Sequence, residues 1–449
     1  MLTKEITNNN GTIKLGDFIV IQKQNFRKLH KFNKLDSIVT LGKDSINLNG
    51  IQGCKYFSIF KTVYKSNSKN KVLTVELVDV VVRLKDEIDV KTSGNDNRHI
   101  LDDGNSQKLT AADIEILKND ACKASDIVET LITNSNTFHS KTEFSQDKYL
   151  KKKEKKYFEY IQILKPTLRT VAEIMYKLEP GKINHLRLDT LSQIITFANV
   201  SSEGNHLLYD SGSNGLLAAA LVSAIGQNTN GKLLHMHPGN MSQKQALLAM
   251  NFSKEQLDRC VSVNVYSTLR QFYQGCDRNI IKDTKEDDTS ENLDKRKSTE
   301  TMLEPECKRA KMDEDLQSDL ENSINPALIE DMSKQTENKK PKWHFDNLAA
   351  SQLLSSKMDS LIIACKEDPH NIFYELMAFV KPGRPFVIYF NVAEPLQQLY
   401  TSLKSQSNVA ALRLTCNWLR NYQILPDRTH PEVMMNGASG FLLSGYILK

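Results

Sequence analysis

The sequence predicts an α/β protein built from two different domains: a small β-barrel or sandwich, followed by a Rossmann-like, doubly wound domain. The first ninety residues form short alternating apolar and polar segments, separated by Gly, Asn, Asp and Lys clusters, which is typical of strands. From about Leu186 onward, apolar runs of strand length alternate with helical stretches, which indicates β-α units and a mainly parallel sheet. With 449 residues, 40% of them hydrophobic and 25% charged, the chain has the composition and the length for both domains.

The N-terminal β domain is expected to occupy residues 1–92. Its predicted strands lie within Thr12–Lys23, Tyr56–Tyr64 and Val72–Val82. One connection is crowded with basic residues, which are Lys23, Arg27, Lys28, His30, Lys31 and Lys34. A basic loop on a small barrel is either solvated surface or an RNA contact, and both interpretations stay open.

Residues 93–185 are expected to form a linker and a basic helical region. Ser93–Ser106 is polar, and Leu109–Asn134 has helical spacing, with Thr110 placed to cap a helix through Asp113. The densest positive charge of the chain follows, with tyrosines between the lysines and few compensating acids. We predict a phosphate-binding helix there, with a solvated helix face as the alternative. Its candidate RNA-binding residues are Lys148, Lys151, Lys152, Lys153, Lys155 and Lys156.

Residues 186–449 are expected to form the doubly wound domain. Strands are predicted at Leu207–Tyr209, Lys232–Met236, Ser262–Val265, Ser360–Ala364, Phe386–Asn391 and Arg413–Trp418, and Phe441–Leu448 is predicted to close the sheet. Helices are predicted at Leu216–Ile225, Ser242–Met250 and Pro395–Ser405. The seven strands match the seven-stranded sheet of methyltransferases.

The turn after the first of these strands resembles a cofactor loop. Asp210 ends the apolar run, and a glycine-containing turn leads into a helix, as in nucleotide-binding α/β folds. In enzymes that use S-adenosylmethionine (SAM) the loop reads acid-x-Gly-x-Gly-x-Gly, whereas here the positions are Asp210, Gly212, Asn214 and Leu216. The missing glycines would allow close approach of backbone to ligand, so we expect a filled or distorted pocket. An ordinary strand-to-helix turn is the alternative.

An insertion is expected to interrupt this domain at about residues 276–341. No aromatic residue occurs between Tyr273 and Trp343, and polar and charged residues dominate, so the segment is predicted to be disordered. It contains Lys295-Arg296 and, after eleven residues, Lys308-Arg309-Ala310-Lys311. Two such basic clusters are typical of a bipartite nuclear signal, and chance in a lysine-rich segment is the alternative. We therefore expect a nuclear protein.

Metal, thiol and membrane chemistry have little support. His185, His237 and His430 lack metal-ligand spacing with other donors, so we expect structural roles and no metal. The seven cysteines form no CxxC pair, which suits a reducing compartment. The longest apolar stretch is about half of the roughly 20 residues that a bilayer span needs, so no membrane partner is expected.

Four runs of the sequence, taken together, resemble one family closely. They begin at Lys141 (KTEFSQDKYLKKK), Glu179 (EPGKINHLRLDTL), Lys381 (KPGRPF) and Trp418 (WLRNYQILPDRTHP). In this order they resemble the non-catalytic subunit of the eukaryotic tRNA (adenine-58-N1) methyltransferase, over the whole chain except the insertion. The resemblance implies a tRNA-binding and assembly subunit without a cofactor of its own. It also implies a catalytic partner that binds SAM, and a heterotetramer with two copies of each chain that methylates adenine N1 in the T loop.

Two further positions agree with a non-catalytic role. The strand Lys232–Met236 runs into His237 with no carboxylate for the ribose hydroxyls of a cofactor, and Cys365 follows the strand where the catalytic relatives carry an aspartate. The resembling runs add Arg187, Arg384, Arg420 and Arg428 as candidate RNA-binding residues. An active SAM-dependent RNA methyltransferase with an atypical loop is the alternative function, and a scaffold without a role in methylation is a third.

Overall fold

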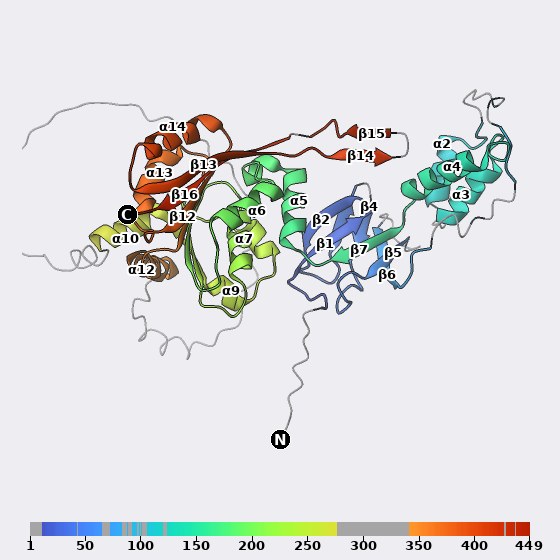
Figure 1. The fold of residues 1–449 in the computed structure, drawn as a ribbon. Helices are drawn as coiled ribbons and strands as arrows, with labels where there is room; N and C mark the ends of the chain where they lie inside the picture. Colours follow the sequence, from blue (N-terminus) through green and yellow to red (C-terminus); the bar gives the residue numbers. More distant parts are fainter. Residues whose placement is uncertain are drawn as a thin grey trace, which may run out of the picture.

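The computed structural model describes residues 11–42, 44–64, 72–82, 88, 92–96, 98, 100, 106–119, 124–275, 341–425, 428–435 and 437–449. The predicted insertion, Pro341 apart, and both of its basic clusters lie outside the described residues. Within the described ranges no helix is long and apolar enough to cross a membrane. The described parts lie in a row, with the helical region at one end, the N-terminal sheet in the middle and the larger α/β domain at the other end (Figure 1).

The N-terminal domain is a nearly closed seven-stranded sheet, which confirms the predicted β domain. Its strands are β1 (Phe18–Lys23), β2 (Phe26–Lys31), β3 (Ile38–Leu41), β4 (Asp44–Asn47), β5 (Ile59–Tyr64), β6 (Val72–Val78) and β7 (Tyr160–Leu164). They are hydrogen-bonded in the order β2-β1-β7-β5-β6-β4-β3. Alternate residues such as Ile19, Ile21, Ile161 and Ile163 enter one buried core, as the two-residue period of a strand requires.

Strand β7 completes this sheet from a distant part of the sequence. It is antiparallel to both β1 and β5, although the helical region separates it from β6 along the chain. The helices α2 (Ala111–Asn119), α3 (Ala124–Thr133) and α4 (Glu143–Lys156) are therefore inserted between two strands of one sheet.

The helical region has a small core of its own. Val128, Ile132, Phe138 and Leu150 cluster there. The predicted cap of α2 is confirmed: the Asp113 backbone N–H donates to Thr110 Oγ1 (3.2 Å), and the Thr110 N–H donates to the Asp113 carboxylate (2.9 Å). The segment Leu109–Asn134, predicted to be helical throughout, contains two helices, α2 and α3.

The C-terminal domain is the predicted doubly wound domain. Its seven-stranded sheet has the order β10-β9-β8-β11-β12-β16-β13, with β16 antiparallel to both of its neighbours. The strands are β8 (Asn205–Asp210), β9 (Lys232–His237), β10 (Cys260–Asn264), β11 (Ser360–Ala364), β12 (Arg384–Phe390), β13 (Val409–Trp418) and β16 (Ala438–Ile447). Each contains or overlaps one of the predicted strands, but β13 and not the last strand forms the edge.

Helices cover both faces of this sheet. One face carries α5 (Leu168–Leu178), the 3-10 turn η1 (Pro180–Ile183), α6 (Leu188–Phe197), α7 (Leu216–Ile225), α8 (Gln245–Ala249) and α9 (Lys254–Asp258). The other carries α10 (Val265–Gln274), α12 (Lys342–Ser355), α13 (Pro369–Met377) and α14 (Ala393–Lys404). Neighbouring residues of the central strands enter opposite cores: Leu208 and Ile362 pack with the first set, and Leu207 and Leu361 pack with the second.

A two-stranded arm lies between β13 and β16 along the chain, although these two strands pair directly in the sheet. It consists of β14 (Tyr422–Leu425) and β15 (Arg428–Pro431), which pair only with each other in the described structure, and it projects from the domain (Figure 1). The sequence patterns did not predict this arm.

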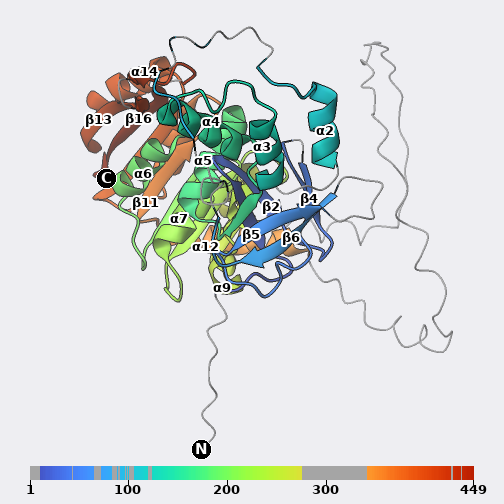
Figure 2. The same ribbon diagram turned by 90° about the vertical axis from the view of Figure 1, so that its right-hand side faces the viewer.

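The two domains are joined by specific contacts. The Asn251 side chain accepts a hydrogen bond from the Phe18 N–H (2.8 Å) and donates one to the Phe18 carbonyl (2.7 Å), so it pairs with the start of β1 as a neighbouring strand would. Helix α5 packs against β2, and the two lie beside each other in both views (Figure 2). The N-terminal sheet thus has a defined position on the α/β domain.

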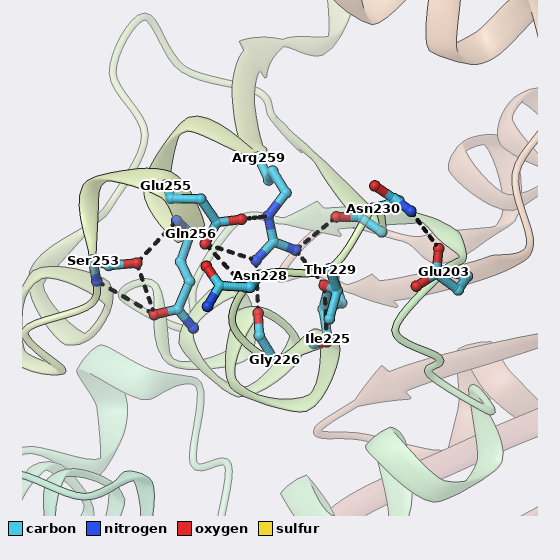
Figure 3. Close-up of polar contacts among 11 residues, drawn as sticks. Glu203, Ile225, Gly226, Asn228, Thr229, Asn230, Ser253, Glu255, Gln256 and Arg259 are labelled. Carbon is cyan, nitrogen blue, oxygen red and sulfur yellow. Dashed lines mark hydrogen bonds and ion pairs between the residues drawn. The ribbon is translucent and has the colours of Figure 1, made fainter. Parts of the chain in front are cut away.

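One arginine organises the amino ends of β9 and β10. The Arg259 guanidinium binds the Glu255 carboxylate (2.6 Å), Thr229 Oγ1 (2.8 Å) and the carbonyls of Gly226 and Gly231 (2.7 and 2.9 Å) (Figure 3). With a second bond to Glu255, these contacts use all five N–H donors of the side chain. Arg259 therefore holds the loop after α7 in place, and no N–H of its guanidinium is left to bind a ligand.

Candidate functional site

The carboxyl ends of β8, β9, β10 and β11 form the edge of the sheet at which doubly wound proteins bind their ligands. The residues at these ends are Asp210, His237, Asn264 and Ala364. The loops after β8, β9 and β11 contact one another through hydrogen bonds and close packing. These contacts determine which groups at this edge are available to a ligand.

Asp210 is used by its own turn. Its carboxylate is buried and accepts hydrogen bonds from the backbone N–H groups of Gly212 (3.0 Å) and Ser213 (2.8 Å) and from the Ser213 hydroxyl. The Ser213 oxygen in turn accepts the N–H of Leu217 in the first turn of α7 (3.2 Å). An acid that satisfies this many internal donors holds the strand-to-helix turn together.

Asn214 and Gly215 follow with positive φ angles of 55° and 77°. Asparagine tolerates the left-handed region better than most residues, so the turn keeps the conformation that a glycine would give it. The replacement of a motif glycine by Asn214 therefore leaves this backbone in a glycine-like conformation. Leu216 begins α7 and is fully buried, as an ordinary core residue.

The segment after β9 covers the turn from one side. Gln243 Oε1 accepts the Asn214 N–H (3.1 Å), the Asn214 side chain donates to Gln245 Oε1 (2.7 Å), and a Cβ on Gly215 would lie 2.7 Å from the Gln243 carbonyl oxygen. A Cβ does not fit here because the backbone of Gln243 approaches this position closely. A filled pocket at this loop stays a prediction.

The segment after β11 covers the turn from the other side. The side-chain stem of Lys366 crosses Gly212 so closely that an added Cβ would lie 2.5 Å from Lys366 Cε. Glu367 accepts hydrogen bonds from the Ser211 hydroxyl (2.5 Å) and the Lys366 N–H (3.0 Å). The next acid, Asp368, caps α13 by accepting the His370 N–H (2.9 Å). Both carboxylates near the end of β11 therefore have structural partners.

Strand β9 ends in histidines at the place where a cofactor-binding strand would carry an acid. His235 is buried, with Nε2 3.9 Å from the Asp210 carboxylate, and burial lowers its pKa to about 4 although Asp210 opposes the shift. Burial also lowers the pKa of His237. The Nδ1 of His237 is buried and has no hydrogen-bond partner among the described residues. Both rings are neutral at pH 7, so neither replaces the missing negative charge.

A buried amide network lies beside the end of β12, and the sequence patterns did not reveal it. Asn184 donates to the Cys365 carbonyl (3.2 Å), and its own side-chain oxygen accepts from Asn391 (2.6 Å). The Tyr389 hydroxyl donates to the Asn184 carbonyl (2.9 Å). Asn184 and His185 both have positive φ. Asparagine and histidine are among the residues that adopt this conformation most readily. Burial raises the pKa of the Cys365 thiol strongly, so it is no thiolate nucleophile at neutral pH.

The described residues contain no group of three His, Cys, Asp or Glu side chains that could hold a metal ion. His185 and His430 are exposed, and the His430 ring lies 3.0 Å from the Pro431 carbonyl.

Helix α4 presents most of the predicted lysines to solvent. Gln146 and Leu150 anchor one side of it, and Gln146 donates to the carbonyls of Thr92 and Phe138 (2.9 and 3.0 Å). Lys151 pairs with Asp147 (2.7 Å), an exposed pair of small energetic value, and the Lys153 ammonium lies 5.0 Å from the Tyr149 ring. The exposed lysines of the helix are Lys148, Lys151, Lys152, Lys155 and Lys156.

The four predicted arginines lie at separate places on the α/β domain. Arg187 is only 6% exposed, forms a two-bond pair with Asp189 (2.8 Å each) and donates to the Gly437 carbonyl (3.0 Å), so its guanidinium is part of the domain's internal packing. Arg384 lies at the amino end of β12, where it pairs with Asp359 (3.2 Å). Arg420 lies at the base of the arm and Arg428 begins β15. Contact of these four residues with RNA stays a prediction, and the position of Arg187 does not favour it.

The basic cluster on the N-terminal sheet is largely paired. Lys23 binds Asp44 (2.7 Å), Arg27 binds Glu173 (3.0 Å), and Lys28 donates to the Thr40 carbonyl (2.9 Å). Lys31 and Lys34 are exposed. This leaves α4 as the element with the larger number of exposed lysines.

Comparison with known proteins identifies the family. Residues 12–304 match the model of the Gcd10p family. The chain is 35% identical to the tRNA (adenine(58)-N(1))-methyltransferase non-catalytic subunit TRM6 of Mus musculus, over 96% of this chain and 87% of that protein. It is 29% identical to the protein of the same name from Dictyostelium discoideum, over 96% and 79% of the two chains.

Among solved structures, the chain is similar to a SAM-dependent O-methyltransferase from Thermotoga maritima (TM-score 0.47, 12% identity, 99% and 97% of the two chains). It is also similar to the tRNA (m1A58) methyltransferase TrmI from Aquifex aeolicus (TM-score 0.43, 10% identity, 98% and 99% of the chains). The sequence matches extend across both domains. The chain therefore belongs to the Gcd10p family.

Proposed function

We propose that this chain is the non-catalytic subunit of a tRNA (adenine(58)-N(1))-methyltransferase, which binds tRNA and completes the assembly while a partner subunit binds SAM and carries out methyl transfer. Its family and the names of its relatives support this proposal. The observation that carries it is the closed turn at residues 211–215. Protein groups from the segments after β9 and β11 occupy the surroundings in which a cofactor would need free backbone donors.

The chemistry at the neighbouring strand ends supports the same role. A SAM-binding site needs an acid for the ribose hydroxyls, and here the neutral His237 ends β9. A base that assists loss of a proton from adenine is also missing at the end of β11, since Cys365 keeps its proton and Asp368 caps a helix. Three separate changes at one edge favour a binding role over the alternative of an active enzyme with an atypical loop.

This chain contributes to the complex by binding the tRNA. Adenine N1 lies on the base-pairing edge, so the enzyme has to extract the base, and a clamp on the folded tRNA offsets part of that cost. RNA shape is contacted mainly through phosphate and 2′-hydroxyl groups and by stacking. The exposed lysines of α4 are suited to phosphate, and they lie on a helix that its buried side holds in place.

The partner subunit is proposed to contact the two-stranded arm. Ile424 of β14 is 77% exposed and Tyr422 is also largely exposed, and so are the two residues that flank the arm along the chain, Trp418 before it and Met434 (96%) after it. Exposed apolar residues gathered on one projection are unusual in a monomer and indicate a protein interface. Leu442, Leu443 and Ile447 of the last strand, β16, are buried inside the domain and do not offer such a surface. Two copies of each chain remain the proposed stoichiometry.

The arm can be tested by co-expression with the catalytic subunit. Changing Ile424 and Met434 to serine should sharply reduce the amount of complex that co-purifies, because the interface would lose apolar area. Ile38→Ser, at an exposed isoleucine on the N-terminal sheet, is the matched control. Unchanged co-purification of the arm variant would exclude the arm as the interface.

Nuclear import is proposed to depend on the two basic clusters between residues 295 and 311. Deleting residues 283–337 should move the protein to the cytoplasm and leave methylation by the purified complex nearly unchanged. Nuclear accumulation of the deletion protein would contradict the first expectation. Loss of methylation in vitro would contradict the second.

Reconstitution tests the function itself. The catalytic partner is assayed on a tRNA transcript alone, with this chain, and with an unrelated protein of equal size. N1-methylation of adenine 58 should require this chain. Full activity of the partner alone would contradict an assembly role, and methylation by this chain alone would establish the alternative.

A further inference from the structure

A hollow of about 260 Å³ lies where the β1–β2 hairpin meets α5. It lies between the two domains, away from the closed turn at residues 211–215, and the hairpin and the helix that form it are adjacent in Figure 1. Its volume is slightly below the range of about 300–1,000 Å³ that is usual for small-molecule pockets, which suits one planar ring system.

The walls of this hollow combine an apolar surface with positive charge. Phe26 is 40% exposed, and Ile174 and Leu178 of α5 complete the apolar part. Arg27 and the exposed Lys177 supply two cations. An accessible aromatic ring next to cations is the combination that binds unstacked nucleotides, because every base has a face that stacks and every nucleotide carries a phosphate.

Side-chain amides at the same place are already oriented. Gln22 Oε1 accepts a hydrogen bond from Arg27 Nε (2.8 Å), which leaves the Gln22 amide N–H groups to donate elsewhere. Gln24 Nε2 donates to the Lys155 carbonyl (2.7 Å), which leaves the Gln24 side-chain oxygen as an acceptor. A donor and an acceptor held in this way match the alternating donors and acceptors on the edge of a base.

The one acid in the wall is held by two arginines. Glu173 accepts from Arg27 (3.0 Å) and from Arg169 (2.8 Å), so its charge is compensated and the Arg27 guanidinium is fixed in position. Each carboxylate oxygen keeps a lone pair that can accept a hydrogen bond from a base N–H or a ribose hydroxyl.

The hollow is physically connected to the lysines of α4. The bond from Gln24 reaches the carbonyl of Lys155 in the last turn of that helix. Lysines that hold a phosphate backbone would therefore bring the same strand to the hairpin. This link favours RNA over a peptide or a free metabolite as the ligand.

We propose that this hollow, defined by Gln22, Gln24, Phe26, Arg27 and Lys177, binds one unstacked nucleotide of the tRNA, with its base stacked on Phe26 and its phosphate near Lys177. The proposal deepens the proposed function, on which it rests. It assigns this chain a local contact with a single-stranded part of the tRNA in addition to phosphate contacts along α4.

The test uses the complex of the full chain with its catalytic partner. Phe26→Ala should weaken tRNA affinity about tenfold through loss of stacking, whereas Phe26→Tyr should retain it. Phe345→Ala, at a phenylalanine that is 57% exposed on α12, is the matched control and should have no effect. SAM binding by the complex should not change in any variant. Ultraviolet cross-linking of the wild-type complex to tRNA should label the peptide that contains Phe26.

The outcomes separate this inference from the proposed function. Unchanged affinity of Phe26→Ala and an unlabelled peptide, together with weaker binding when the α4 lysines are replaced, would refute the hollow and leave the proposed function intact. A loss of assembly with normal tRNA affinity in the remaining complex would show a protein contact instead, and would also overturn the inference. Absence of tRNA binding by the wild-type complex would refute the proposed function itself.

Discussion

The turn at residues 211–215 and helix α4 show two opposite uses of polar side chains. At the turn, Asp210 and Asn214 bind partners within the chain, and neighbouring segments cover the backbone. On α4, side chains such as those of Lys152 and Lys155 extend into solvent from a helix that Gln146 and Leu150 anchor. Changes at the turn should therefore affect folding, and changes on the exposed side of α4 should affect RNA binding. Turn variants that alter only RNA binding, or α4 variants that alter only folding, would contradict this distinction.

The largest effect is expected from Asp210→Ala. The change would leave the N–H groups of Gly212 and Ser213 and the Ser213 hydroxyl without their buried acceptor, at a cost of about 3 kcal/mol in the free energy of unfolding. Asp210→Asn keeps one side-chain oxygen and should cost less. Denaturant unfolding of the co-purified complex measures both. Wild-type stability of the alanine variant would show that the turn does not depend on this acid.

A smaller effect on the free energy of unfolding is expected when the pH is lowered. The folded chain lowers the pKa of His235 to about 4, whereas the unfolded chain binds a proton near the ordinary value of 6.5. Stability from this residue is thus complete above pH 6.5 and falls as the pH drops toward 4, by roughly 1 kcal/mol at about pH 5.5. His235→Gln removes the titration and should flatten the dependence between these values. An equally steep loss in that variant would assign the pH dependence to other groups.

The smallest effect on folding is expected from replacing the lysines of α4. Replacing Lys151, Lys152, Lys153, Lys155 and Lys156 by alanine should leave folding and SAM binding by the partner intact, since alanine is a good helix former. Affinity of the complex for tRNA should fall, and the slope of log affinity against log salt should decrease by about 0.7–0.9 for each lost phosphate contact. An unchanged slope would identify α4 as a solvated face and direct attention to Lys31 and Lys34.

The parts of the fold that were predicted from the sequence have strong local signals. Strand β8, the turn and α7 form one apolar-glycine-apolar run, and Thr110 with Asp113 forms a cap within four residues. Other elements lack such signals. Strands β3 and β4 have four residues each, which is too short for a clear alternation. The arm residues whose burial is described, 422–424 and 429–431, are all exposed, so no alternation of buried and exposed positions marks these strands.

The candidate site was only partly predictable because its closure is not local. The bonds of Asp210 reach residues two and three positions away, whereas Gln243 and Glu367 cover the turn from 29 and 156 residues away along the chain. A degenerate glycine motif indicates that a pocket has changed. It does not indicate which distant segments fill it.

This chain is expected to contribute no cofactor site to the complex. Titration calorimetry of SAM into the complex of this chain with its catalytic partner tests the claim most directly, because both chains are then folded in their working state. One SAM should bind for each pair of chains, and the same number should bind after Gly212→Ala in this chain. Two SAM molecules per pair, with one lost on mutating the turn at residues 211–215, would contradict this expectation.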